Sequence, residues 1–185
     1  MTKKEIREKY KHLRSELSNT EREHRSIQIA DHFIQHFNPA GKKISCFIPI
    51  DRFHEINTWL ILDKIQATFY LPVMSKDDQL RHIQYEGKDK LKKNSWGILE
   101  PQSGQEIKAN ELDIVLVPLL AIDNQGFRVG YGKGFYDRFL KNCKSDCQII
   151  GLHYFNQFET IEDVHTADIP LQYCITPERI IDFRK

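Results

Sequence analysis

The chain has 185 residues, of which 40% are hydrophobic and 29% are charged, a composition typical of a single globular domain. Its 27 basic residues nearly balance its 26 acidic residues, which excludes the broad positive surplus that non-specific nucleic-acid binding needs. No stretch approaches the roughly 18 apolar residues of a membrane span, and the basic N-terminus lacks the apolar segment of a signal peptide. The four cysteines form no CxxC pair, which predicts reduced thiols. We therefore expect one cytoplasmic domain over residues 1–185, without nucleic-acid or membrane partners. We also expect a monomer, although the composition does not determine the oligomeric state.

The first 37 residues predict two helices. Apolar residues recur at helical spacing in the first helix, at Ile6, Tyr10, Leu13 and Leu17. Ser18 followed by Glu21 has the pattern of a capping box, so the second helix is expected to begin near Asn19 or Thr20. Its apolar positions are Ile27, Ala30, Ile34 and Phe37. The Asn-Pro-Ala-Gly sequence at 38–41 predicts its end.

The remaining chain alternates between strand and helix patterns. Strands are expected at 43–50, 68–74, 80–85, 113–117, 148–153 and 178–183, and helices at 57–66 and 135–143. Such alternation favours a parallel sheet with helices on both faces. We therefore predict a three-layer α/β/α fold, Rossmann-like, with a mainly parallel (mixed) sheet and two N-terminal helices. Ligands of such sheets bind beyond the carboxyl ends of the strands.

A run of alternating glycines (Gly130, Gly132 and Gly134) lies between an expected buried strand and an expected helix. Glycine lets backbone N–H groups approach an anion closely, and Arg128 and Lys133 would add positive charge. The run lacks the serine or threonine that follows GK in a Walker A motif, and its GxGxG spacing differs from the dinucleotide-binding GxGxxG. By itself it fits either a phosphate cradle or a tight structural turn.

The stretch 113–140 resembles the central signature of the 5-formyltetrahydrofolate cyclo-ligase family, whose members are also called 5,10-methenyltetrahydrofolate synthetases. The matching positions are Asp113, Pro118, Ala121, Asp123, Gly126, Arg128, Gly130, Gly132, Gly134, Phe135, Tyr136 and Asp137. Further resemblance extends over essentially the whole chain. It implies an enzyme that converts 5-formyltetrahydrofolate and MgATP to 5,10-methenyltetrahydrofolate, ADP and phosphate.

The resemblance implies a nucleotide site at two places in the sequence. Lys3 and Arg7 match the family's N-terminal basic element, and they are four residues apart, on one face of a helix. Without the resemblance this pair reads as a solvated basic face. The residues expected at ATP are Lys3, Arg7, Arg128, Gly130, Gly132, Lys133, Gly134, Phe135 and Tyr136. Three of them, Arg128, Lys133 and Tyr136, are the expected catalytic residues.

Two of these assignments stay open. Either Arg128 or Lys133 stabilises the transferred phosphoryl group, and Tyr136 either orients the formyl group or packs beneath the loop. The resemblance also implies that Asp137 and Asp168 hold Mg²⁺, a hard cation that prefers carboxylate oxygens. From the residues alone, Asp137 equally fits a helix-dipole partner, and Asp168 equally fits a loop acid.

The resemblance implies a folate site at Ile50, Glu55, Trp96 and Tyr154. A glutamate suits a pterin because its two oxygens can accept the parallel donors of N3–H and the 2-amino group. Glu55 otherwise reads as a loop acid, Ile50 as a buried strand end, and Trp96 as a core aromatic. Two alternative functions remain: a non-catalytic folate-binding protein, and another enzyme using ATP or a sugar phosphate in a related α/β superfamily.

Overall fold

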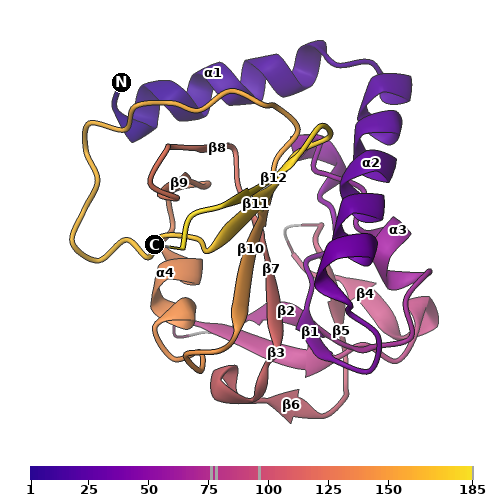
Figure 1. The fold of residues 1–185 in the computed structure, drawn as a ribbon. Helices are drawn as coiled ribbons and strands as arrows, with labels where there is room; N and C mark the ends of the chain where they lie inside the picture. The colour runs from indigo at the N-terminus through magenta and orange to yellow at the C-terminus, as the bar shows by residue number, and fades with distance from the viewer. Residues whose placement is uncertain (76, 78, 96, 185) are drawn as a thin grey trace.

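The computed structural model describes residues 1–75, 77, 79–95 and 97–184. Its centre is a mixed sheet in the order β12-β11-β10-β7-β1-β2-β3-β6 (Figure 1). Five neighbouring strands run parallel: β1 (Lys43–Ser45), β2 (Thr68–Met74), β7 (Ile114–Pro118), β10 (Gln148–Leu152) and β11 (Tyr173–Ile175). Antiparallel strands complete both edges: β3 (Leu80–Gln84), β6 (Glu106–Ile107) and β12 (Ile180–Asp182).

Helices cover both faces of this sheet. Successive side chains of a strand point to opposite faces, so a buried strand packs against a helix layer on each side. Ile114 and Leu116 of β7 pack in the cluster that contains α2 (Asn19–Phe37) and α3 (Trp59–Leu62). The intervening Val115 and Val117 pack in the cluster of α4 (Phe135–Leu140). Figure 1 shows α2 and α4 on opposite sides of the strands. The predicted three-layer α/β/α fold with a mainly parallel sheet is confirmed.

Two N-terminal helices are also confirmed. The first, α1 (Lys3–Glu16), and α2 each begin with a capping box, formed by Thr2 with Glu5 and by Ser18 with Glu21. The buried face of α2 is rotated from the expected one: Ile27 is exposed, and the buried positions are Ser26, Ile29, Ala30, Phe33 and Phe37. The helix α1 lies over a hairpin of β8 (Ala121–Ile122) and β9 (Arg128–Val129).

Several expected elements are shorter than their sequence patterns predicted. The strand expected at 43–50 ends at Ser45, because side chains take over the backbone groups that follow it. The Thr58 hydroxyl donates to the Phe47 carbonyl (2.5 Å), and the Glu55 carboxylate accepts from the Ile50 N–H (2.8 Å). The helices expected at 57–66 and 135–143 end at Leu62 and Leu140. Some short strands were not predicted, because two or three residues are too few to show an alternating pattern. Examples are β4 (Leu91–Lys93) and β5 (Leu99–Pro101).

The order of the strands defines where a ligand cavity belongs. From β1 the chain passes through α3 to β2, and from β7 it passes through α4 to β10 on the other side. Since α3 and α4 cover opposite faces, the chain diverges between β1 and β7. In open α/β sheets the crevice beyond the carboxyl ends of such a strand pair is the usual binding site.

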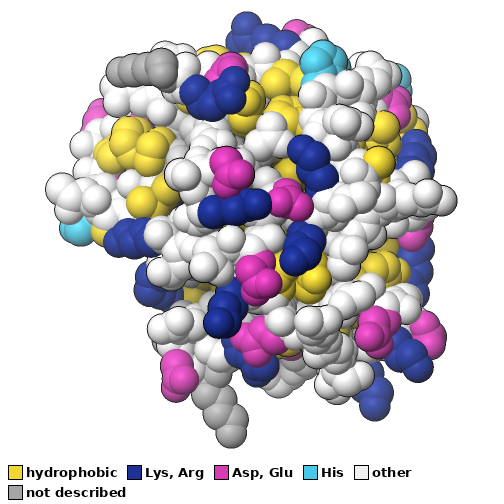
Figure 2. Space-filling model, turned by 60° about the horizontal axis from the view of Figure 1, so that its bottom comes forward, with side chains coloured by type: hydrophobic (Ala, Val, Ile, Leu, Met, Phe, Trp, Pro, Cys, Tyr) yellow, Lys and Arg dark blue, Asp and Glu magenta, His cyan; other side chains and the backbone are white. Residues whose placement is uncertain are grey.

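The surface carries both signs of charge (Figure 2), and the described helices are not of a kind that crosses a bilayer. Basic and acidic side chains are interspersed over the face that Figure 2 presents. In the described part of the chain, no helix combines the length and apolarity that crossing a bilayer requires.

A buried histidine lies between the sheet and α4. His82 of β3 is 1% exposed, and its ring stacks on Phe139 with centroids 4.1 Å apart. Neither ring nitrogen has a hydrogen-bond partner among the residues that the structure describes. Burial disfavours the charged ring and lowers the pKa of His82 to about 3.

We expect His82 to make the protein less stable as the pH falls. Between pH 6.5, the ordinary value, and about 3, the unfolded chain binds a proton at His82 that the folded chain excludes. In this window His82 should reduce the free energy of unfolding by about 1.4 kcal/mol per pH unit. Urea unfolding from pH 7 to 4 should therefore show a shallower pH dependence for His82→Phe than for wild type. Equal slopes would contradict a neutral buried His82.

Candidate active site

A cavity of about 610 Å³ opens at the expected crevice, beyond the carboxyl ends of β1 and β7. Its walls come from α1, the loop after β1, the glycine loop at 130–134 and the start of α4. A smaller apolar pocket of about 150 Å³ adjoins it. The residues that line both are Ile50, Met74, Ile98, Pro118, Tyr131 and Tyr136. One continuous space therefore runs from a basic outer part to an apolar inner part.

The basic outer part is formed by α1 and the glycine loop. Lys3, Arg7 and Lys133 line it. The Arg7 Nε donates to the Gly130 carbonyl (2.9 Å), which fixes the helix against the loop. Gly132 has φ +91°, and a β-carbon there would lie 3.2 Å from the Arg7 guanidinium. The positive φ therefore favours glycine there, and an added β-carbon would require the Arg7 side chain to shift by a few tenths of an ångström.

The guanidinium group of Arg128 is buried and hydrogen-bonded within the protein. Its side chain is 6% exposed, and its terminal nitrogens donate to the Ile169 carbonyl and to Asp137 Oδ1, both at 2.7 Å. Burial lowers the pKa of the Arg128 guanidinium, and the neighbouring Asp137 carboxylate opposes that shift. The Ile169 N–H also donates to Asp137 Oδ1 (3.0 Å). These bonds join α4 to the segment that carries Asp168.

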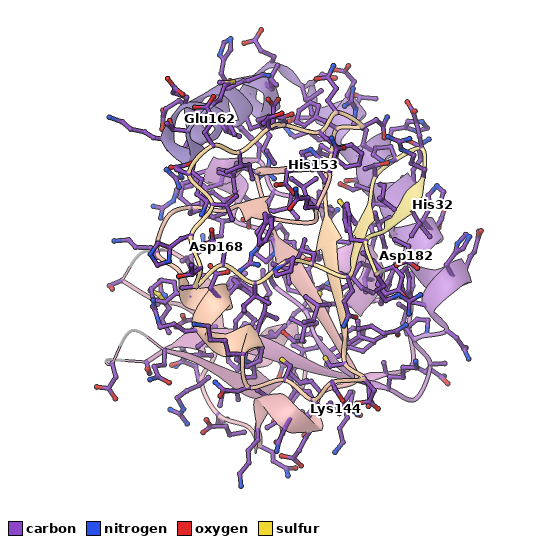
Figure 3. All side chains as sticks on the ribbon, turned by 60° about the vertical axis from the view of Figure 1, so that its left-hand side comes forward. His32, Lys144, His153, Glu162, Asp168 and Asp182 are labelled. Atoms are coloured by element: carbon purple, nitrogen blue, oxygen red, sulfur yellow. The ribbon has the colours of Figure 1, made fainter. Side chains whose placement is uncertain are left out.

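The second predicted metal ligand lies beside the first. Asp168 lies on the long segment that passes near α4 in Figure 3, and its Oδ2 pairs with the Lys3 ammonium. Burial alone would raise the pKa of Asp168, but the bonds from Lys3 and from the His165 N–H lower it overall. Both Asp137 and Asp168 line the large cavity. The structure thus brings Lys3, at the start of α1, to the same site as Asp137 and Asp168.

These two aspartates fit a cation that binds through few protein ligands. Among the described residues, the hydrogen bonds of Asp137 fall on Oδ1 and those of Asp168 on Oδ2, so each retains one uncommitted oxygen. No group of three or more His, Cys, Asp or Glu side chains in the described chain is arranged to hold a metal. Mg²⁺ commonly uses only one or two carboxylates and completes its shell with waters and phosphate oxygens.

The inner pocket contains one buried carboxylate. Glu55 is 9% exposed; its Oε1 accepts from the Tyr131 hydroxyl (2.7 Å) and its Oε2 from the Ile50 N–H (2.8 Å). Burial raises the pKa of Glu55, while these hydrogen bonds and the charge of Arg14 counteract the rise. Each oxygen keeps lone-pair capacity for one more donor. An apolar pocket ending on such a carboxylate suits a flat ligand with adjacent N–H groups.

Tyr136 supplies a second polar atom to the pocket. Its hydroxyl is buried and has no hydrogen-bond partner among the described residues. Buried polar atoms are normally paired, so an unpaired hydroxyl on a cavity wall is available to a ligand. Burial raises the pKa of Tyr136 well above its usual range, so the hydroxyl remains a donor at neutral pH.

One predicted folate residue, Tyr154, lies outside the main cavity. Tyr154 is 1% exposed and lies behind Glu55: its hydroxyl donates to the Glu55 carbonyl (2.9 Å), and the residue lines a separate cavity rather than the main one. Trp96 is outside the described residues. Sequence reasoning missed Tyr131, Arg14 and Phe53. An aromatic residue between two loop glycines was the available signal for Tyr131, whereas Arg14 carried none.

The fold and the cavity define an α/β protein whose ligand site lies where the chain diverges between β1 and β7. One end of this site is basic and glycine-rich, and the other end is apolar with a buried acid. The chain belongs to the 5-formyltetrahydrofolate cyclo-ligase family, whose model matches residues 1–177. It is an enzyme of that family.

Individual relatives agree with this assignment. The 5-formyltetrahydrofolate cyclo-ligase of Haemophilus influenzae is 29% identical over 180 residues, covering 91% of this chain and 94% of the relative. That of Escherichia coli K12 is 33% identical over 145 residues, or 74% of this chain and 79% of the relative. The structure of Aquifex aeolicus 5,10-methenyltetrahydrofolate synthetase superposes with a TM-score of 0.85 at 27% identity, over 100% of this chain and 94% of the other.

Proposed function

We propose that the chain catalyses the ATP-dependent cyclisation of 5-formyltetrahydrofolate to 5,10-methenyltetrahydrofolate, with release of ADP and phosphate. The observation that carries this proposal is the continuous cavity, basic at the glycine loop and apolar with a buried carboxylate at Glu55. A cavity of this form can hold a triphosphate and a pterin in contact. Holding two reactants together is a large part of what catalysis of phosphoryl transfer requires.

The chemistry begins with a formamide, whose carbon is a poor electrophile and whose oxygen is a poor leaving group. In the proposed first step the formyl oxygen attacks the γ-phosphorus, the bond to ADP breaks, and an iminium phosphate forms at N5. In the second step N10 attacks the formyl carbon and the C–O bond breaks. Phosphate leaves with the formyl oxygen and takes up the N10 proton, so atoms and charge balance.

At the nucleotide end, Lys133 is the better candidate for contact with the transferred phosphoryl group. Lys133 is exposed on the cavity wall, whereas both terminal nitrogens of Arg128 are committed to protein oxygens. We therefore assign Arg128 to the positioning of Asp137. The remaining triphosphate contacts are assigned to Lys3, Arg7, the backbone at 130–134, Phe135 and Tyr136.

A pair of glycine variants tests the nucleotide assignment. Gly132→Ala should weaken ATP binding about tenfold, because its β-carbon meets Arg7 and its φ of +91° disfavours an L side chain. Gly41→Ala is the control, since its φ is also positive (+73°), its β-carbon meets nothing within 4 Å, and it lies outside the cavity. Binding of a non-hydrolysable ATP analogue is measured by calorimetry. Equal affinities for the two variants would refute the proposed role of the Arg7 contact.

At the folate end, we assign the pterin to Glu55 and Ile50, with Trp96 and Tyr154 completing the predicted set. The carboxylate would accept the N3–H and 2-amino donors of the pterin. The position of Tyr154 supports an indirect role through the Glu55 backbone. We assign the unpaired Tyr136 hydroxyl to the formyl oxygen, where it would orient the group for attack on phosphorus.

We further propose that Asp137 and Asp168 hold Mg²⁺ with the triphosphate. When bound, Mg²⁺ would neutralise phosphate charge and assist the departure of ADP. Asp168→Asn should raise the Mg²⁺ concentration for half-maximal activity about tenfold, because one anionic ligand is lost. Activity is measured against Mg²⁺ at saturating ATP, with exposed Asp146→Asn as the control. An unchanged Mg²⁺ requirement would remove Asp168 from the metal site.

A spectrophotometric assay tests the proposed reaction. Methenyltetrahydrofolate absorbs in the near ultraviolet, so its appearance from 5-formyltetrahydrofolate should depend on both ATP and Mg²⁺. Folate binding without this signal would instead indicate a non-catalytic folate-binding protein. Absence of both, in protein with a cooperative unfolding transition, would indicate another ATP-using or sugar-phosphate-using enzyme.

We also propose that the enzyme works as a cytoplasmic monomer, without nucleic-acid or membrane partners. The four free cysteines of the described chain support a reducing compartment, and the net charge of only +1 argues against a nucleic-acid partner.

A further inference from the structure

A buried arginine lies behind the folate end of the cavity. Arg14 of α1 is 2% exposed, and its Nη2 donates to the Leu119 carbonyl. Its Nη1 donates to the Tyr131 hydroxyl (3.1 Å), which in turn donates to Glu55 Oε1 (2.7 Å). A continuous chain of hydrogen bonds therefore joins a buried cation to the buried carboxylate of the pocket.

The direction of these bonds follows from the chemistry of the groups. A guanidinium has only N–H donors, so the Tyr131 oxygen must accept from Arg14. The single proton of the Tyr131 hydroxyl is then donated to Glu55. The phenol ring is held by Phe53, which stacks on it with centroids 4.9 Å apart and planes at 27°. Arg14 thereby fixes both the orientation and the donor role of Tyr131.

The same arrangement opposes the effect of burial on Glu55, which raises the pKa of its carboxyl overall. Isolated burial of a carboxylate strongly favours its neutral form. The groups in contact with Glu55 are the Tyr131 phenol, the Tyr154 hydroxyl on its backbone carbonyl and the Ile50 N–H, and the Tyr136 phenol is close enough to interact. On its other side Glu55 lines a second cavity together with the charged or titratable residues Arg22, Glu23, Asp51 and His54. The cation whose charge acts on Glu55 is Arg14, which lowers the pKa of the carboxyl against the effect of burial. A protonated Glu55 would lose an acceptor that the pterin needs.

We propose that Arg14 is a positioning residue that acts through Tyr131 to align the Glu55 carboxyl for folate. Because this rests on the proposed function, the test begins with a readout that needs no substrate. The inference concerns folate recognition only: the nucleotide end of the cavity should not depend on the Arg14–Tyr131 pair.

The first measurement is the titration of Glu55 in the ligand-free protein, by carbon NMR of glutamate labelled at the side-chain carboxyl. Glu55→Gln identifies the signal. Tyr131→Phe and Arg14→Met should both raise the pKa of Glu55, because each removes a group that stabilises the carboxylate. Arg184→Met is the control, because the Arg184 guanidinium pairs with Asp182 and the residue lies outside both cavities that Glu55 lines. A Glu55 titration equal to wild type in both test variants would overturn the inference.

The second measurement separates positioning from general structural damage. Tyr131→Phe should weaken binding of 5-formyltetrahydrofolate about 10- to 100-fold, with the affinity for an ATP analogue unchanged. If Arg14 acts through Tyr131, the double variant Arg14→Met/Tyr131→Phe should bind folate no more weakly than the poorer single variant. Fully additive losses, or an equal loss of ATP affinity, would contradict the inference. Failure of wild type to bind folate would instead count against the proposed function, since the NMR titration stands without it.

The pH dependence of kcat/KM for folate supplies a further readout. It should not shift if Arg14 and Tyr131 only stabilise the fold. Folate binding requires the charged form of Glu55, so kcat/KM for folate should fall at acidic pH as Glu55 protonates. In Tyr131→Phe this acidic limb should shift to higher pH, because the pKa of Glu55 is higher there. An acidic limb unchanged in position, with folate affinity reduced, would overturn the assignment.

Discussion

Glu55→Gln is expected to weaken binding of 5-formyltetrahydrofolate by about 3 kcal/mol, or roughly 100-fold, with little effect on ATP. In wild type both carboxylate oxygens already accept one protein donor and have capacity for one pterin donor. Glutamine would place an NH₂ group where one of these acceptors is needed. Because Glu55 is 9% exposed, water cannot readily replace the lost acceptor. Calorimetric titration with 5-formyltetrahydrofolate in the absence of ATP measures the change.

The control for this prediction is Glu106→Gln. Glu106 is a half-exposed carboxylate of β6 that pairs with Arg81 and lies outside the cavities that Glu55 lines. It should bind folate with wild-type affinity. If Glu55→Gln also binds folate as wild type does, the pterin lies elsewhere and the assignment of the inner pocket is wrong.

Lys133→Met is expected to lower kcat about 100- to 1,000-fold, while folate affinity stays near that of wild type. Lys133 is the exposed cation of the glycine loop, at the outer part of the cavity. Its charge should act mainly on the phosphoryl group as that group transfers, so its loss should affect the rate more than binding. Single-turnover formation of methenyltetrahydrofolate at saturating ATP and folate isolates this step.

Lys141→Met is the appropriate control, because Lys141 is an exposed lysine directly after α4 and does not line the cavity. It should retain wild-type kcat. A Lys133→Met enzyme with normal kcat and an increased KM for ATP would show that Lys133 only binds nucleotide. The transferred phosphoryl group would then need another partner, and Arg128 would be the next candidate.

The layers of the fold were predictable because their sequence patterns are long. The capping box at Ser18 located the start of α2, and the apolar stretch at 113–117 located β7 almost to the residue. Prediction failed where contacts distant in sequence decide the conformation. The strand expected at 43–50 stops at Ser45, because Thr58 and Glu55 bind the backbone beyond it. No local pattern encodes that competition.

The site was predictable to a different extent. The resemblance to a known family located the glycine loop, Glu55 and the two aspartates, and the structure brings these residues to one cavity or its inner pocket. It did not indicate the Arg14–Tyr131–Glu55 chain of hydrogen bonds, because Arg14 occupies a helix face that reads as ordinary from its spacing. Nor did it reveal that Arg128 is buried against Asp137, the contact on which the proposed positioning role of Arg128 rests. The individual ligand contacts stay predictions.

The central claim is that one cavity brings the γ-phosphate of ATP to the formyl oxygen of the folate. Its most direct test uses 5-formyltetrahydrofolate whose formyl oxygen carries a heavy isotope, with the released phosphate examined by mass spectrometry. The proposed route transfers that oxygen to phosphorus, so each phosphate formed should carry one heavy atom. Unlabelled phosphate, with the heavy oxygen recovered in water, would mean that ATP is hydrolysed separately and that the two ends of the cavity do not act on one another.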